Sequence, residues 1–446
     1  MVFKRIGLKN LLSSFINAIL VTLLFVISYK FYNINIITQN IEDIGFDVID
    51  KFIINTREVK VNAPYTFVLT IDNKYMKFNK LYDEDNETTY GYLLPRDKLA
   101  NIIRKIDIFF KNTAKSNQPK ALFIDYDLTF TSMPYGKELS NEDKQLLDVL
   151  KQPRKYIIIL PKTSKYNFIQ YSKDKKIQQL IKDKKIIFAS VGVYNGYDDS
   201  VRRYPIYQFI KEKNGTKKAY INADVLMWWL VRKNSIPTIK DINNTFKYNY
   251  DVIANRIRFK DDMDKIDYDD CSIIKSYWKN YIKMSANCSL NKIKSKFYKD
   301  SLIIIGGTDK ENDDKFYILN VLGNKKLSGV ELHANILQTL FLLNGQTQRL
   351  SLLVSATIIF LLYFITSFFI SQFIKFLKIS NKGIDTIVTI LLNIIILFSL
   401  SSFLLIKYNI WFNWFIAFLL FEIEEVIDFI KDIIPIFIKK IKGKGV

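Results

Sequence analysis

Long apolar runs mark the parts of this chain that can cross a membrane. Uncharged runs of at least 19 residues occur at Leu11–Tyr29, Leu350–Ile374 and Thr386–Ile406. A helix needs about 20 apolar residues to span a bilayer core, so each run is long enough. Tyr408–Phe421 is an uncharged run of 14 residues, rich in Trp and Phe, and its helix would have to continue into the following residues to span. We predict four transmembrane helices.

Between the first two of these runs the pattern changes to short apolar stretches separated by polar, helix-like segments. Five stretches are apolar enough for buried strands: Tyr65–Asp72, Ala121–Asp125, Tyr156–Leu160, Ile186–Val191 and Leu302–Ile305. Pro95–Phe110 has the spacing of a helix with one apolar face, and Asn222–Val231 is predicted to be an apolar helix. Continuous apolar strands that alternate with helices indicate a mostly parallel sheet covered on both faces. The predicted fold is therefore an α/β domain joined to an all-α membrane part.

The last predicted strand and helix close this domain. Leu302–Ile305 stops at Gly306-Gly307, and a helix follows from Gly329 and ends at Asn344-Gly345, a typical C-cap. The polar segment 261–299 has no clear pattern. We therefore divide the chain into 1–31, an N-terminal tip and helix; 32–348, the α/β domain; 349–427, a three-helix membrane bundle; and 428–446, a basic amphipathic tail.

Charged residues beside the apolar runs predict the orientation. Basic residues precede the first run, separate the second from the third, and end the chain. Short basic segments stay in the cytoplasm, which places both termini inside and residues 32–348 outside the inner membrane of a bacterium. The first run has no cleavage site of small residues after it, so we expect an uncleaved anchor. Most of the net charge of +21 then lies outside, and nucleic acid is excluded as a partner.

Two motifs resemble one family. Gly329–Asn335 reads GVELHAN directly before an apolar helix and membrane segments, and Val191–Ile206 reads VGVYNGYDDSVRRYPI, a turn-rich loop that ends in an Arg pair. Together with strands that end in Asp72 and Asp125, these motifs resemble the CHASE domain of the second type, a cyclase/histidine-kinase-associated sensory extracellular domain. The resemblance implies a sensor that binds a ligand or reports the state of the envelope.

Four residues are candidates for a ligand site in such a domain: Asp72, Asp125, Arg202 and His333. Strand C-termini and helix N-termini meet at one edge of an open α/β sheet, so the two strand-end carboxylates and His333 should lie near each other. His333 is the only histidine, which excludes a metal site with two histidines. The alternative is a structural role, in which a carboxylate–histidine contact fixes a loop.

A catalytic alternative rests on two further motifs. Phe123–Thr129 reads FIDYDLT and Gly306–Asp314 reads GGTDKENDD, which resemble the nucleophile motif and the acidic magnesium loop of haloacid-dehalogenase-like phosphatases. In that chemistry Asp125 attacks phosphorus and Asp127 acts as the acid and base. However, the strand Tyr65–Asp72 precedes a motif that should open its domain. We therefore predict no enzyme, no cofactor and no metal.

The remaining expectations concern the cysteines and the partners. Cys271 and Cys288 are an even pair in an oxidising compartment, which favours a disulfide over two free thiols. Ile423–Ile441 forms one apolar stripe, which indicates a helix that lies on lipid or binds another protein. No output domain is recognisable, so we expect a separate membrane or cytoplasmic partner and a homo-oligomer. A structural subunit of an envelope complex is the alternative from another class.

Overall fold

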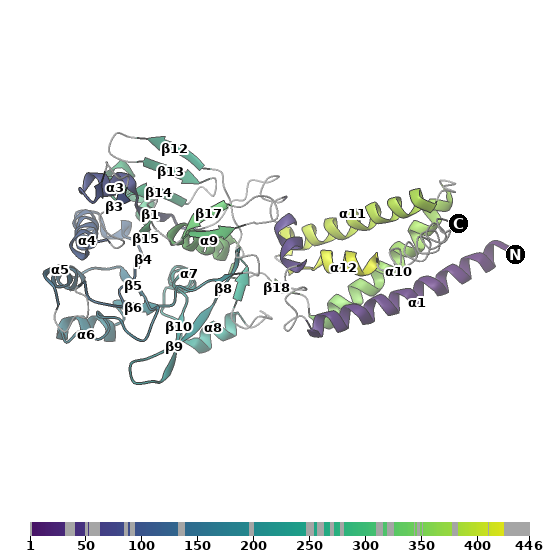
Figure 1. Cartoon of the computed structure of the whole chain (residues 1–446), viewed down its shortest axis with the longest axis horizontal. Helices are drawn as coiled ribbons and strands as arrows, with labels where there is room; N and C mark the ends of the chain where they lie inside the picture. The colour runs from purple at the N-terminus through teal and green to yellow at the C-terminus, as the bar shows by residue number, and fades with distance from the viewer. Residues whose placement is uncertain are drawn as a thin grey trace, which may run out of the picture. The chain divides into compact units, whose positions relative to one another are not determined.

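The computed structural model describes residues 2–31, 41–49, 52, 63–83, 88–89, 94–132, 139–195, 200–246, 254–256, 263–267, 272–276, 281–308, 315–318, 325–342, 344–345, 348–349, 351–376, 382–408 and 410–422. It divides into two compact units (Figure 1). One is the continuous stretch Arg57–Gln346, and the other combines Met1–Thr56 with Thr347–Val446.

An eight-stranded sheet organises the first unit, in the order β12-β13-β14-β1-β15-β4-β5-β6. The strands from β14 to β6 run parallel, whereas β12 and β13 add an antiparallel edge. Their bounds are β1 (Thr66–Ile71), β4 (Ala121–Asp125), β5 (Ile157–Pro161), β6 (Ile186–Ala189), β12 (Met263–Asp267), β13 (Ser272–Ser276), β14 (Tyr281–Ser285) and β15 (Leu302–Gly307). The mostly parallel sheet predicted from the apolar runs is confirmed, and β15 enters it between β1 and β4.

Helices cover both faces of this sheet because its strands are apolar on both sides. Phe67 and Leu69 of β1 belong to a core that includes α4 (Arg96–Lys111) and α5 (Asn141–Leu150). Val68, between them, points into a second core with α7 (Ala223–Lys233) and α9 (Gly329–Leu342). Successive side chains of a strand alternate between its faces, so a continuous apolar run supplies both cores.

The end of α9 matches the sequence pattern. Gly345 has a φ of 110°, a left-handed conformation that glycine adopts without strain, and its N–H donates to the Leu340 carbonyl over 2.8 Å. The lysine-rich run 173–185 contains α6 (Lys175–Lys182), of which only Ile177 is buried. A polar face on a solvated helix therefore explains that run.

Strands occur in the predicted loop 191–206 and in the polar segment 261–299, for which no fold was predicted. The turn-rich stretch 191–206 includes β7 (Tyr194–Asn195) and β8 (Val201–Pro205), and β8 also pairs with β11 (Ala254–Arg256). The polar segment 261–299 supplies β12, β13 and β14, with β14 paired directly to β1. The other short elements of this unit are α3 (Asn73–Phe78), β2 (Tyr82–Asp83), β3 (Thr88–Thr89), η1 (Lys115–Asn117), β9 (Tyr207–Lys211), β10 (Lys217–Ile221), α8 (Ile239–Thr245), η2 (Leu290–Lys292), η3 (Ser295–Tyr298), β16 (Lys315–Ile318) and β17 (Lys325–Ser328).

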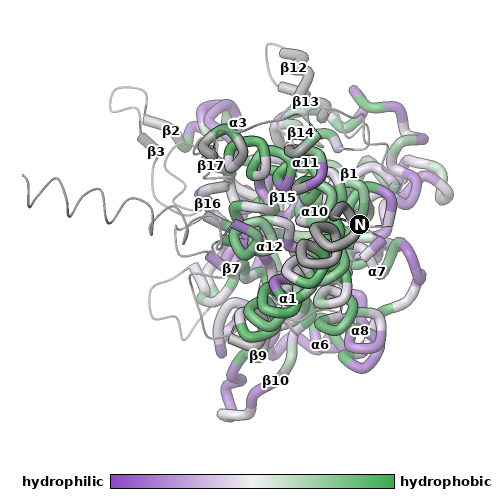
Figure 2. Tube along the Cα trace, turned by 90° about the vertical axis from the view of Figure 1, so that its right-hand side faces the viewer, coloured by the Kyte–Doolittle hydropathy of each residue, from purple (hydrophilic) through white to green (hydrophobic). Residues whose placement is uncertain are grey.

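Among the described residues of the second unit, three helices are long and apolar enough to cross a membrane: α1 (Val2–Phe31), α10 (Leu352–Phe376) and α11 (Lys382–Tyr408). Figure 2 shows their largely hydrophobic colouring. The predicted fourth span is not confirmed, because α12 (Trp414–Phe421) has 8 residues and residues 423–446 lie outside the described part. The short strands β18 (Gln348–Arg349) and β19 (Ile410–Trp411) pair within this unit.

Residues 41–49 form a helix that packs in the membrane unit. Phe46 lies edge-on to Trp411, with their ring centroids 5.0 Å apart, and the Trp414 indole N–H donates to the Gly45 carbonyl over 3.0 Å. A Cβ on Gly45 would lie 2.7 Å from Cβ of Phe415. Glycine at this position therefore allows the helix to approach α12 closely.

Candidate functional site

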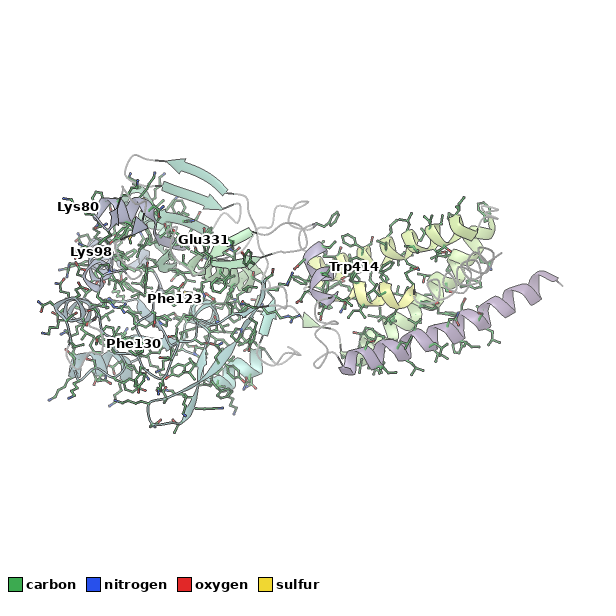
Figure 3. All side chains as sticks on the ribbon, viewed as in Figure 1. Lys80, Lys98, Phe123, Phe130, Glu331 and Trp414 are labelled. Carbon is green, nitrogen blue, oxygen red and sulfur yellow. The ribbon has the colours of Figure 1, made fainter. Side chains whose placement is uncertain are left out.

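His333 lies between two carboxylates inside the α/β unit. His333 lies in α9 and its side chain is buried. Its Nδ1 is 2.7 Å from Oδ2 of Asp224, and its Nε2 is 3.8 Å from Oδ1 of Asp125. The Phe123 ring packs edge-on against the imidazole, with centroids 5.2 Å apart, and Figure 3 labels Phe123 within this unit. The structure thus brings together two of the four predicted ligand residues, Asp125 and His333.

A glycine on the neighbouring strand makes this arrangement possible. Asp125 is the last residue of β4, and Gly306 is its register partner on β15. A Cβ on Gly306 would lie 2.6 Å from Cβ of Val330, at the start of α9. Because glycine has no side chain, the first turn of α9 can lie directly over the strand ends. The predicted meeting of strand C-termini and a helix start is therefore present.

Asp224 completes the cluster and was not predicted. It lies in the first turn of α7, where the Asn222 side chain caps the helix by accepting from the Asp224 backbone N–H over 2.9 Å. Its side chain is completely buried, and within the described residues Oδ1 has no hydrogen-bond partner. Burial raises the pKa of the Asp224 carboxyl, and His333 opposes that rise. The only sequence signal was an acidic residue two positions after a helix cap.

Asp72 has a different set of contacts. It follows β1 and caps α3, because its carboxylate accepts from the Tyr75 backbone N–H over 2.8 Å. The Ser285 hydroxyl also donates to it over 2.8 Å, and Thr70 lies 3.4 Å away. These contacts explain the strand-end aspartate as a helix cap and as a link between β1 and β14. In the described part of the chain, neither Asp125 nor His333 is a hydrogen-bond or ion-pair partner of Asp72.

Arg202 is held inside the domain. It lies in β8 and is 4% exposed, although the sequence placed it in a loop. A buried guanidinium needs charged or polar partners to offset its desolvation. Its membership of a ligand site stays a prediction.

Glu331 ties α9 to the sheet on the other side of the helix start. Its carboxylate lies 2.5 Å from the Lys283 ammonium on β14, and it accepts from the Ser328 N–H over 3.1 Å and the Ser328 hydroxyl over 2.9 Å. Burial alone would raise the pKa of this carboxyl, but Lys283 and Ser328 outweigh burial and the pKa lies below its ordinary value. Glu331 also appears in Figure 3.

The phosphatase motif can be located only in part. Asp127 Oδ1 accepts from the Thr129 N–H over 2.9 Å and lies 3.4 Å from the Thr163 hydroxyl. Asp309 and Asp313 of the acidic loop lie outside the described residues. Within the described residues, no group of three or more His, Cys, Asp or Glu side chains is placed to hold a metal ion. The imidazole of His333 lies between the carboxylates of Asp224 and Asp125, so this arrangement can hold a proton between them.

The cysteine pairing stays a prediction. Cys288 is buried, and Cys271 lies outside the described residues. The residue after Cys271 begins β13, which pairs antiparallel with β14, and β14 ends three residues before Cys288. Both cysteines are therefore connected to the same end of one strand pair.

Comparison with known proteins identifies the family. The model of the CHASE2 domain matches residues 19–371, which span the α/β unit and extend into membrane helices on both sides. No curated protein and no solved structure matches the chain significantly. The match covers most of the chain and confirms the resemblance seen in its motifs. The chain therefore belongs to the CHASE2 family of sensory extracellular domains.

Proposed function

We propose that this protein is a bacterial inner-membrane sensor whose extracytoplasmic α/β domain binds a small molecule and signals through its membrane helices. Both termini lie in the cytoplasm, and residues 32–348 lie outside. One observation supports this proposal above the others. Helix α9 is fastened to the sheet by buried polar contacts and leads, after nine residues, into the membrane helix α10.

Helix α9 contacts the rest of the domain through both apolar packing and polar side-chain contacts. Val330, Leu332, Ile336, Leu337 and Leu340 are all buried in the core that α9 shares with α7. Fully burying such a side chain contributes roughly 1.5–3 kcal/mol, so the helix is strongly held. His333 and Glu331 add contacts to Asp224, Asp125 and Lys283, which lie on three different elements. Packed polar contacts of this kind favour discrete arrangements over gradual sliding.

A ligand can shift the domain only by its difference in affinity for two states. If those states differ in how α9 sits on the sheet, the short connection to α10 passes the difference to the membrane helix. We propose that the output goes to a separate membrane or cytoplasmic protein bound at the stripe Ile423–Ile441. We also propose that the protein acts as a homo-oligomer with lipid around its membrane helices.

The test uses the full chain in lipid nanodiscs. Small molecules from an envelope extract are offered, and bound species are identified by native mass spectrometry. Coupling between ligand binding and the membrane helix is measured on the variant Phe376→Cys. Phe376 lies at the end of α10, and its side chain is 81% exposed. We expect the bound molecule to change the reaction rate of this cysteine with a maleimide at least twofold.

A matched variant separates binding from coupling. Gly-Ser-Gly-Ser inserted into segment 346–350 should leave binding intact and abolish the rate change. A bound molecule that leaves the rate unchanged in the native chain would contradict the sensor proposal and favour a structural subunit. Turnover of the bound molecule, lost in Asp125→Asn, would replace the proposal with the phosphatase alternative.

A further inference from the structure

A groove lies between α4 and the chain that follows β14, away from the His333 cluster. Its volume is about 500 Å³. Pockets that bind small molecules are typically about 300–1,000 Å³ and mostly apolar, with a few polar groups that orient the ligand. We refer to this space as the α4 groove. None of the four predicted ligand residues lines it.

The α4 groove has an apolar floor and one apolar wall. Leu69 of β1 and Ala286 lie at its base, and both are buried. The wall is a single face of α4, because Ile102, Ile106 and Phe109 recur at helical spacing. Ile108, at the rim, is 55% exposed although it is apolar. An apolar ligand body would cover surface that the chain leaves in contact with water.

The opposite wall comes from the segment that carries the second cysteine. Cys288 and Leu290 are buried there, and Asn287 fixes the segment by donating to the Lys74 carbonyl over 3.1 Å. This segment follows β14, which the sequence did not predict as a strand. The groove therefore exists because residues 281–291 are joined to the sheet beside β1.

The charge on the described lining of the groove is positive only. Among the described residues that line the groove, Lys105 is the only charged one, and it forms no ion pair with any of the described residues. It lies on the same face of α4 as Ile102 and Phe109, so its ammonium stands beside the apolar wall. Asn112, Ser289 and Asn291 add uncharged polar groups at the rim. A complementary ligand has an apolar body and one negative charge.

We propose that the α4 groove binds a small organic monoanion, an aliphatic or aryl acid, with its apolar part against α4 and its carboxylate beside Lys105. As the input of the sensor this inference rests on the proposed function, whereas binding itself does not. The same chemistry occurs in the acyl chains and acidic headgroups of the bilayer. The volume favours a free acid.

The test is photo-crosslinking of the full chain in nanodiscs with diazirine-labelled decanoate. We expect labelling of α4 and residues 286–291, competed by unlabelled decanoate, with at least fivefold less labelling by the matching decanol. Lys105→Glu should weaken binding about fivefold. Asn112→Trp, at the exposed rim, should abolish labelling by filling the groove. Lys111→Glu, on the same helix outside the lining, is the control and should change nothing.

Several outcomes would overturn the proposal. Equal labelling by decanoate and decanol, or no response to Lys105→Glu and Asn112→Trp in protein with unchanged thermal unfolding, removes the groove as an anion site. Label only on α1, α10 and α11, or competition by anionic phospholipid in the nanodisc, assigns the bilayer as the source. If decanoate labels the groove but leaves Phe376→Cys unaffected, the site stands and its role as sensor input fails. If another molecule alters Phe376→Cys without entering the groove, the sensor stands and the groove proposal fails.

Discussion

At the scale of single residues, the His333–Asp224 pair is the contact most sensitive to change. A buried ion pair adds little net stability over apolar residues of the same size, but removing one partner leaves the other desolvated and alone. Asp224 has no exposed side-chain surface, and Nδ1 of His333 lies 2.7 Å from it. The pair therefore acts as a constraint on where α7 and α9 meet.

Removing the imidazole should cost more than neutralising the acid. We expect His333→Ala to lower the free energy of unfolding by about 3 kcal/mol, because Asp224 loses its partner. Asp224→Asn keeps a hydrogen-bonding side chain and removes the buried charge, so its loss should be smaller. Thermal unfolding of the full chain, followed by tryptophan fluorescence, measures both. Lys98→Ala, on the surface of α4, is the control, and equal losses in all three variants would contradict this view.

The lowered pKa of Glu331 predicts that the free energy of unfolding falls at low pH, which is opposite to the effect of the raised pKa of Asp224. The pKa of Glu331 in the folded chain lies below the unfolded value of about 4.3, so the unfolded state takes up a proton first as the pH falls. The stabilisation from Glu331 is complete above that value and disappears as the pH drops through the folded pKa. At pH 7 we expect Glu331→Gln to cost about 2 kcal/mol, because the charged hydrogen bonds to Lys283 and Ser328 weaken.

The measurement is the difference in stability between native chain and Glu331→Gln at several pH values. The difference should shrink below about pH 4 as the native carboxyl becomes protonated. A difference that stays constant from pH 7 to pH 3 would show that Glu331 acts through packing alone. Ser328→Ala should show a weaker form of the same trend.

At the scale of elements, the stability of the β13–β14 pair depends on whether the chain segments at one end of the pair are joined by a disulfide. β14 is joined to β1 on one side, but β12 and β13 form the free edge of the sheet. A disulfide between Cys271 and Cys288, which have 16 residues between them, should add about 3 kcal/mol in the chain-entropy model. The disulfide would also restrain residues 286–291, which form the wall of the α4 groove opposite α4.

Non-reducing peptide mapping of exported protein should find Cys271 joined to Cys288. Reduction should lower the unfolding temperature and weaken decanoate binding, since Cys288 lines the groove. The double variant Cys271→Ser with Cys288→Ser should behave like reduced protein and should not respond to reductant. Recovery of both cysteines alkylated without prior reduction would refute the pairing.

The sequence predicted elements well where one physical signal dominated. The runs that became β4 and β15 are continuously apolar because both faces are covered, and the end of α9 was marked by glycine. β14 was missed because Tyr281–Ser285 mixes polar and apolar residues and gains its place from pairing with β1. Within the site, the Asp125–His333 contact followed from the topology. Asp224 could not be predicted, since the position of α7 depends on packing between distant segments.

At the scale of the whole molecule, orientation in the membrane determines what the domain can sense. The basic segments predict that Lys378 is cytoplasmic and Lys115 is outside. A cysteine introduced at Lys115 should react with a membrane-impermeant thiol reagent in intact cells with a permeable envelope, and one at Lys378 should not. Native chain without added cysteines gives the background. Strong labelling at position 378 would reverse the orientation and place the α/β domain inside.

The position of β15 has a consequence for biosynthesis. Its partners β1 and β4 are complete once residue 125 has left the ribosome, but β15 itself ends at Gly307. Until β15 has been synthesised, β1 and β4 each have an unpaired edge. Unpaired strand edges are prone to wrong pairing. Almost the whole domain must therefore be synthesised before its sheet can close. A chain stopped anywhere before residue 302 lacks the strand that lies between β1 and β4, and such a chain would be a substrate for chaperones and proteases.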